Sequence, residues 1–179
     1  MKIISYIQST DGKINSNSLE AFVATQKICK NIKGEAYMLT FDESVANELK
    51  KYESNGIILL NNEFLNEYNP LYYLKSLEKI YEKFSPDFMI FGHTYQTRDW
   101  VPRLSARMDS PFISDCINFI NDDSLNLVRP IYQAKLNEEI KLDGAGIISF
   151  QSGSFSLDDI QKGNSTINKI NIDLDDVIL

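Results

Sequence analysis

The stretch GHTYQTRDWVPRLSARM, residues 92–108, holds the only His and the only Trp of the chain together with three Arg. It follows an apolar run, FMIF, that is typical of a buried strand. In open α/β sheets, ligands bind beyond the carboxyl ends of the strands. A helix that begins here would present free N–H groups and a positive field, to which an arginine adds a full charge. Gly92, Thr97 and Arg98 are therefore candidates for binding a phosphate or a carboxylate.

From chemistry alone, a structural interpretation of the same residues is favoured. Asp99 would offset the helix dipole and pair with Arg103 one turn later, which would only start and stabilise a helix. Neither GxGxxG nor GxxxxGK[ST] occurs, so Gly92 alone is weak evidence for a phosphate site. His93 has no carboxylate or nucleophile beside it in the sequence, and we find no nucleophile elbow. A small hydrolase is thus the weakest of the functional interpretations, and no catalytic residue is predicted.

Composition and charge limit the class of protein. A chain of 179 residues suits one domain with a sizeable core. The net charge of −7 argues against a general nucleic-acid binder, and no apolar run approaches the roughly 20 residues needed for membrane insertion. Met1 leads directly into the first apolar segment, so we expect no leader peptide. Cys29 and Cys116 are flanked by apolar residues and predict buried free thiols in the cytoplasm, and with one His they make a zinc site improbable.

Short apolar segments alternate with amphipathic ones over the first 108 residues. The predicted strands cover residues 2–8, 35–41, 56–60 and 87–92. Asn17 and Glu20 resemble a capping box for the first helix, Asp42 can cap the second, and Asn69 can cap the third ahead of a proline. The fourth helix is predicted to begin at Arg98. Four such βα units predict an α/β fold with a mainly parallel sheet and helices on both faces.

The pattern changes after residue 110. A strand over 111–120, a turn at NDDS (121–124) and a strand over 125–132 are predicted, followed by one more strand at 144–150. From residue 152 the chain is polar, which predicts a linker or an extended tail outside the core. We therefore divide the chain into a domain over residues 1–156 and a tail over residues 157–179.

The motifs TRDWVPRLSARM, ISD, VRPIYQAK and SGSF, in this order, resemble the N-terminal domain of the electron transfer flavoprotein alpha subunit. The opening IISYIQSTDGKINSNSLEAFVATQKI is similar to the start of that family, so the resemblance covers residues 1–156. The residues that match the family motifs are Arg98, Asp99, Pro102, Arg103, Leu104, Ala106, Arg107, Ser114, Asp115, Arg129, Pro130, Ile131, Tyr132, Lys135, Gly153 and Phe155. The resemblance implies a Rossmann-like three-layer fold with extra C-terminal strands, of the adenine nucleotide alpha hydrolase-like kind.

The resemblance also implies a function. Members of this family are flavin-dependent electron carriers in which an alpha subunit pairs with a beta subunit, takes electrons from dehydrogenases on FAD and passes them to a quinone reductase or another acceptor. Most FAD contacts lie in a second domain of the alpha subunit, so FAD belongs to the complete complex and none is expected on this chain alone. The N-terminal domain would then be a structural and docking platform rather than an enzyme. Its interface candidates here are Trp100, Arg103, Arg107, Arg129 and Tyr132.

An alternative is a stand-alone adenine-nucleotide-binding module, because the related beta subunit binds AMP in a similar domain. Such a module would use the turn from Gly92 to Arg98 and the end of the first strand, residues 8–11. Thr97 stands where the family has glycine, and its side chain makes close approach of a phosphate to the backbone harder.

Overall fold

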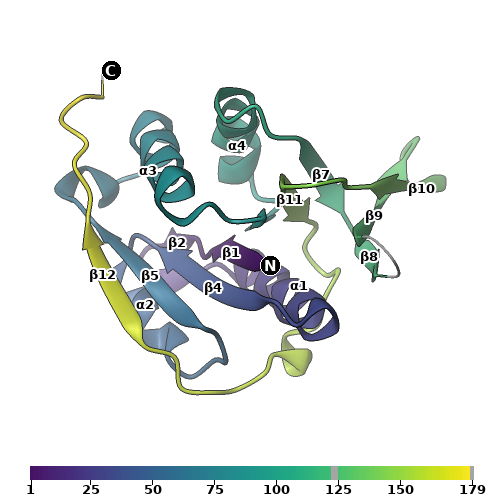
Figure 1. The fold of residues 1–179 in the computed structure, drawn as a ribbon, viewed down its shortest axis with the longest axis horizontal. Helices are drawn as coiled ribbons and strands as arrows, with labels where there is room; N and C mark the ends of the chain where they lie inside the picture. Colours follow the sequence, from purple (N-terminus) through teal and green to yellow (C-terminus); the bar gives the residue numbers. More distant parts are fainter. Residues whose placement is uncertain (122–124, 178–179) are drawn as a thin grey trace.

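The computed structural model describes residues 1–121 and 125–177, and seven strands within these ranges form a parallel central sheet (Figure 1). The strand order is β12-β5-β4-β1-β6-β11-β7, and each neighbouring pair runs parallel. These strands are β1 Lys2–Tyr6, β4 Glu35–Thr40, β5 Gly56–Asn61, β6 Phe88–Gly92, β7 Phe112–Cys116, β11 Gly146–Phe150 and β12 Ile167–Asn171. The predicted mainly parallel sheet is confirmed.

The α-helices of the described residues cover both faces of this sheet (Figure 1). They are α1 Ser16–Ile32, α2 Glu43–Leu49, α3 Pro70–Phe84 and α4 Tyr95–Arg107. α1 and α2 bury their apolar side chains on one face, whereas α3 and α4 bury theirs on the other. In β1, Ile3 belongs to the first core and Ile4 to the second, because successive side chains of a strand point to opposite faces. The chain thus has the predicted three-layer α/β fold.

A polar side chain caps the amino end of each of the first three helices, and two of the three caps are the predicted ones. Asp42 caps α2 and Asn69 caps α3, as predicted, each through a side-chain oxygen that accepts N–H groups of the first turn. The first helix is capped by Asn15 and not by Asn17, since Oδ1 of Asn15 accepts the N–H of Ser18 at 3.3 Å. The capping-box interpretation of the first helix is therefore wrong.

α4 begins at Tyr95, earlier than the predicted start at Arg98. The cap is Thr94, whose Oγ1 accepts the N–H of Thr97 at 3.1 Å. The helix therefore includes most of the segment that was predicted to be a turn. Only His93 and Thr94 remain to connect β6 to α4.

A three-stranded antiparallel sheet extends from the body after β7, and we call it the arm (Figure 1). It consists of β8 Asn118–Asn121, β9 Leu125–Ile131 and β10 Leu136–Lys141. The predicted strand over 111–120 is divided between β7 and β8, because a bulge at the left-handed residue Asp115 (φ 64°) redirects the chain out of the central sheet. β10 was not predicted, since its sequence LNEEIK is mostly polar. Residues 122–124 of the predicted NDDS turn lie outside the described residues.

The C-terminal tail joins the central sheet, which corrects the prediction of a linker outside the core. After the short 3-10 helix η2 (Leu157–Asp159), β12 pairs with β5 in parallel register from Ile167 opposite Ile57 to Asn171 opposite Asn61. Further on, Leu174 is buried in the core beneath α3 and α4. The boundary predicted at residue 156 is thus not the end of the packed structure.

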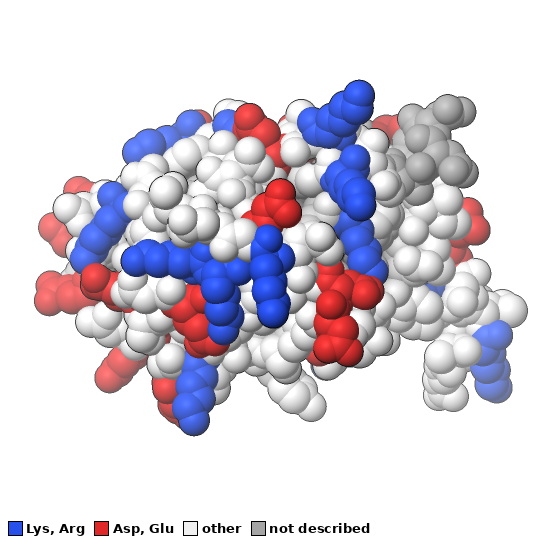
Figure 2. All heavy atoms as spheres, turned by 90° about the horizontal axis from the view of Figure 1, so that it is seen from below, with Lys and Arg blue, Asp and Glu red and all other residues white. Residues whose placement is uncertain are grey.

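Charged side chains of both signs share the surface. On the face that Figure 2 shows, Lys and Arg side chains lie beside Asp and Glu side chains. Ion pairs at the surface of the domain include Lys27 with Asp159 at 2.7 Å and Lys169 with Glu43 at 3.2 Å. None of the described helices combines the length and the apolar character that crossing a membrane requires.

Candidate functional site

The turn after β6 holds Gly92 against α1. A Cβ at Gly92 would lie 2.7 Å from the backbone N of Ser18 and 2.8 Å from the carbonyl carbon of Asn17. The missing side chain therefore admits the first turn of α1, whose backbone occupies the space that a side chain at residue 92 would need. Gly92 thus has a packing role against α1.

Thr97 and Arg98, the other two candidates in this turn, have partners within the domain. Thr97 is buried, and its Oγ1 donates to the carbonyl oxygen of Gly92 at 2.7 Å. Thr94 uses its hydroxyl to cap the helix and to donate to Oε1 of Gln8 at 2.7 Å. Arg98 is exposed, with its guanidinium over the ring of Tyr95. The first turn of α4 is thus capped by Thr94, and Asp99 pairs with Arg103 as the structural interpretation predicted.

The structure places a histidine, a serine and an aspartate in a row that the sequence did not predict. Nδ1 of His93 lies 2.9 Å from Oγ of Ser149, and its Nε2 lies 3.4 Å from Oδ1 of Asp115. The three residues come from the carboxyl ends of β6, β11 and β7, which are adjacent only because β11 lies between the other two. Burial lowers the pKa of His93, while the charge of Asp115 opposes this shift and Arg98 adds to it.

This row connects three strands rather than forming a catalytic site. Ser149 is 0% exposed, so no ligand reaches its hydroxyl. Its Oγ also accepts the backbone N–H of Asp115 at 3.2 Å, which stabilises the bulge in β7. His93 is therefore held by partners within the fold, and the row gives no support to the hydrolase interpretation.

The predicted interface residues of α4 already have contacts within the domain. Trp100 is 0% exposed in the core between α3, α4 and the sheet, which corrects its assignment as a contact residue. Its indole N–H has no acceptor among the described residues. Arg103 pairs with Asp99 at 3.2 Å, and Arg107 pairs with Glu78 of α3 at 3.0 Å. These two arginines lie on the exposed side of α4, where such pairs contribute at most about 1 kcal/mol each.

Two of the predicted interface residues, Arg129 and Tyr132, lie in the arm: Arg129 is paired across the hairpin, and Tyr132 is exposed at its turn. Arg129 of β9 lies directly opposite Glu138 of β10 and forms an ion pair with it. Tyr132 begins the turn between β9 and β10, in a left-handed conformation (φ 50°), and is 74% exposed. Leu136, on the other side of the turn, is 58% exposed. The tip of the arm thus presents two large side chains to solvent.

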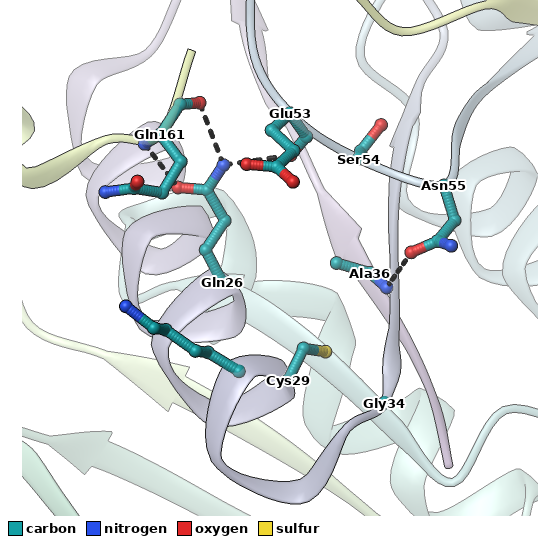
Figure 3. Close-up of a pocket in the computed structure, with 9 residues that line it drawn as sticks. Gln26, Cys29, Gly34, Ala36, Glu53, Ser54, Asn55 and Gln161 are labelled. Atoms are coloured by element: carbon teal, nitrogen blue, oxygen red, sulfur yellow. Dashed lines mark hydrogen bonds between the residues drawn. The ribbon is translucent and has the colours of Figure 1, made fainter. Parts of the chain in front are cut away.

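A pocket at the amino ends of the strands is used for attaching the tail. Figure 3 shows Gln26 of α1 between Glu53 and Gln161: Nε2 donates to both backbone carbonyls, at 2.9 and 3.1 Å, and Oε1 accepts the N–H of Gln161. Cys29 lines the same pocket, and burial raises the pKa of its thiol to about 11. Cys116 is likewise a buried free thiol, whose pKa burial raises to about 12. Burial thus favours the protonated form of both thiols.

A wider cleft lies at the carboxyl ends of β1, β4 and β5 and was missed from the sequence. Its volume is about 570 Å³, and it is lined in part by the hairpin of β2 (Ser9–Thr10) and β3 (Lys13–Ile14) and by the segment after the short helix η1 (Glu63–Leu65). The acidic residues that line it are Asp11, Asp42, Glu43 and Glu67. Of the described residues, no Lys or Arg lines it. A phosphate would be repelled here, which counts against an adenine-nucleotide module.

Comparison with known proteins agrees with the fold. A family model described as electron transfer flavoprotein domain matches residues 3–175. The chain is 29% identical over 143 residues to the electron transfer flavoprotein subunit alpha of Bacillus subtilis, which covers 78% of this chain and 43% of that protein. It is 22% identical over 141 residues to the subunit alpha of Thermoanaerobacterium thermosaccharolyticum, with 76% and 43% covered. The chain spans less than half the length of these relatives.

The family match includes the tail as well as the body. It extends past residue 156 to residue 175, so it takes in β12 and the buried Leu174. The matched segment and the three-layer sheet thus describe one folded unit, and this chain belongs to the electron transfer flavoprotein domain family.

Proposed function

We propose that this chain is an alpha-subunit-like domain of an electron transfer flavoprotein that docks a beta-subunit-like partner through its arm. The observation that carries the proposal is the exposure of Tyr132 and Leu136 at the tip of the arm, in a chain that belongs to this family. Large aromatic and aliphatic side chains that serve as anchors of protein interfaces lie in such exposed positions in the free subunit.

One face of the arm leads from the core to this tip. Along β9, Leu127 is fully buried in the core, Arg129 is half-buried in its ion pair, and Ile131 lies opposite Leu136. These residues share a face, because side chains two apart on a strand point the same way. This face is buried against the domain at Leu127 and exposed to solvent at Leu136. A partner seated against the Ile131–Leu136 pair would extend the apolar core across the interface.

The residues of α4 support docking less well. Trp100 is buried, and Arg103 and Arg107 are already paired with carboxylates of their own domain. A partner that used these arginines would have to replace existing ion pairs, which gains little free energy at an exposed surface. The arm, in contrast, offers apolar area that has no cover among the described residues.

FAD would belong to the complete complex and not to this domain. The diphosphate of a dinucleotide needs N–H groups or cations around it. The described residues do not fit that group: α1 fills the space beside Gly92, and carboxylates line the cleft beyond β1, β4 and β5. We therefore assign no step of flavin chemistry to this chain. Dehydrogenase and quinone-reductase type partners would be engaged by the full cytoplasmic complex.

Co-expression with an electron transfer flavoprotein beta subunit from the same organism tests the proposal. In Tyr132→Ala/Leu136→Ala, loss of two anchors should cost about 1–4 kcal/mol of binding each, so the yield of copurified complex should fall at least about tenfold. Stability should change by no more than about 0.5 kcal/mol, because both side chains are exposed.

The matched control is Tyr95→Ala, which removes an 88% exposed tyrosine from the start of α4. It should leave the yield unchanged. The proposal fails if the wild-type pair does not copurify, or if the control weakens the complex as much as the double variant does.

A further inference from the structure

The arm leaves the central sheet at the bulge of β7, around Asp115 (Figure 1). The backbone of Asp115 is left-handed (φ 64°), a conformation that costs free energy for a residue with a side chain. Its N–H donates to Oγ of Ser149 at 3.2 Å. Just beyond the bulge, the N–H of Ile117 donates to the carbonyl oxygen of Val128 in β9 at 2.8 Å. The hydroxyl of Ser149 therefore helps to fix the point from which the arm departs.

Counting donors and acceptors assigns the protons around this hydroxyl. Oγ of Ser149 accepts the N–H of Asp115, and its own single proton needs an acceptor. Among the described residues, the other hydrogen-bond partner of Oγ is Nδ1 of His93, at 2.9 Å. Nδ1 is then the unprotonated nitrogen, which leaves the proton of the neutral ring on Nε2, 3.4 Å from Oδ1 of Asp115. The fold thus selects the neutral Nε2–H tautomer of His93.

A second proton on the ring reverses the bond between His93 and Ser149. Both nitrogens of the imidazolium are donors, so Nδ1–H would have to donate to Oγ. The hydroxyl would then receive two N–H groups, and its own proton would lose its acceptor. Water does not replace that acceptor, because Ser149 is 0% exposed. Since an unpaired buried donor costs free energy, the protonated ring either turns away from Ser149 or displaces the N–H of Asp115.

The charged groups around the ring do not offset this loss. Burial is the main cause that lowers the pKa of His93, the charge of Asp115 opposes the shift, and Arg98 of α4 adds to it. The side chain of Asp115 is 41% exposed, so solvent weakens its attraction for the imidazolium. The polar side chains of β11 and α1 at His93, Ser149 and Asn17, are uncharged. The neutral ring is therefore the form that fits its surroundings.

We propose that His93 is a positioning residue of the arm and a pH-sensitive switch. The neutral ring holds the hydroxyl of Ser149 in the orientation that accepts the N–H of Asp115, whereas protonation of the ring releases the bulge and loosens the arm from the central sheet. The pairing of β6 with β11, from Phe88 opposite Gly146 to Gly92 opposite Phe150, does not use the ring and should persist. The inference concerns the attachment of the arm and not its partner, so it can fail while the proposed function stands.

NMR on the whole chain, labelled with ¹⁵N, tests the two steps separately. His93 is the only histidine, so its ring nitrogens are observed without overlap. At about pH 8 they should show the Nε2–H tautomer, and the ring should take up a proton before about pH 5. Over the same range, protection of the amides of Asp115 and Ile117 from hydrogen exchange, corrected for the intrinsic effect of pH, should fall at least about tenfold. Amides of β1 and β4 should keep their protection.

Three results would overturn the proposal. One is an Nδ1–H tautomer at high pH, since Ser149 would then be the acceptor already. Another is a ring that stays neutral down to about pH 5, or one that is protonated without loss of protection at the bulge. The third is an equal loss of protection in β1 and β4, which would mark unfolding of the whole domain.

Variants separate the proton count from simple charge. In Ser149→Ala the amide of Asp115 should be as poorly protected at high pH as it is in the acidified wild type. In His93→Gln, which does not titrate, protection at the bulge should be independent of pH. The matched control Asp115→Asn removes the carboxylate but keeps Ser149 and the ring, and it should retain the pH effect. If the effect disappears in this control, the charge of Asp115 and not the hydroxyl of Ser149 holds the bulge, and the proposal is wrong. The midpoint of thermal unfolding of each variant shows that it is folded.

Discussion

Gly92→Ala should destabilise the domain, because the first turn of α1 lies directly on the end of β6. The added Cβ would lie 2.7 Å from the N of Ser18, 2.8 Å from the carbonyl carbon of Asn17 and 2.9 Å from the Cα of Ser18. These are all backbone atoms in a buried part of the helix. They cannot rotate away as the end of a flexible side chain would, so the helix and the strand must separate.

The size of the effect follows from these distances. Ordinary contacts of a Cβ begin near 3.4 Å, so the shortest contact has to open by about 0.7 Å. α1 packs Phe22 and Val23, both fully buried, on the same face of the sheet, and a shift of the helix loosens these contacts too. Overpacking of this kind costs about 1–3 kcal/mol, and a clash with a helix backbone belongs in the upper part of that range. For a chain of this length, about 2–3 kcal/mol lowers Tm by about 4–12 °C.

Urea unfolding followed by circular dichroism measures the change. Gly144→Ala is the comparison variant. A Cβ there meets no described atom within 4 Å, so its cost, about 1–2 kcal/mol, comes only from placing alanine at a φ of +84°. If Gly92→Ala is no less stable than Gly144→Ala, the close approach of α1 does not require glycine, and a binding role for this turn regains support.

Three further predictions concern other parts of the fold. Trp100→Ala should lower the free energy of unfolding in urea by about 3–5 kcal/mol, because the fully buried indole packs edge-on against three aromatic rings. Burial holds the folded pKa of His93 below its unfolded value near 6.5, so the unfolded state binds the proton more readily and stability should fall as the pH drops below about 6.5. His93→Gln should show a smaller fall between pH 7.5 and 5 in the same assay, and an equal fall would assign the effect to other groups. The amides of Ile167–Asn171 that bond to β5 should exchange in D₂O much more slowly than those of a free tail when followed by mass spectrometry, and exchange of the whole segment at the rate of a free tail would contradict the edge strand.

Helix caps could be predicted from the sequence, because they depend on residues that are close together in the chain. Asp42 and Asn69 act as caps through hydrogen bonds to N–H groups two or three residues away, so the signal and its partner lie together in the chain. The start of α4 was misplaced although a signal was present. Thr97, Trp100, Val101 and Leu104 follow the spacing i, i+3, i+4, i+7 of a buried helix face, which would have placed Trp100 in the core.

Features set by the order of strands could not be predicted. The row of His93, Ser149 and Asp115 exists because β11 pairs with both β6 and β7, and nothing near any of the three residues encodes that order. The tail has the composition of a linker because β12 is an edge strand whose side chains are mostly exposed. The acidic cleft likewise gathers Asp11, Asp42 and Glu67 from three separate connections.

The strand order also affects folding during synthesis. β7 joins the central sheet only through β11, and β5 gains its outer neighbour only from β12. A nascent chain that has emerged from the ribosome as far as residue 145 can therefore assemble just β5, β4, β1 and β6, with hydrogen-bonding groups unpaired along both borders. Such open borders invite pairing with other chains. β11 adds to β6 and brings in β7, and β12 adds to β5, so the seven-stranded sheet is complete only after residue 171 has emerged.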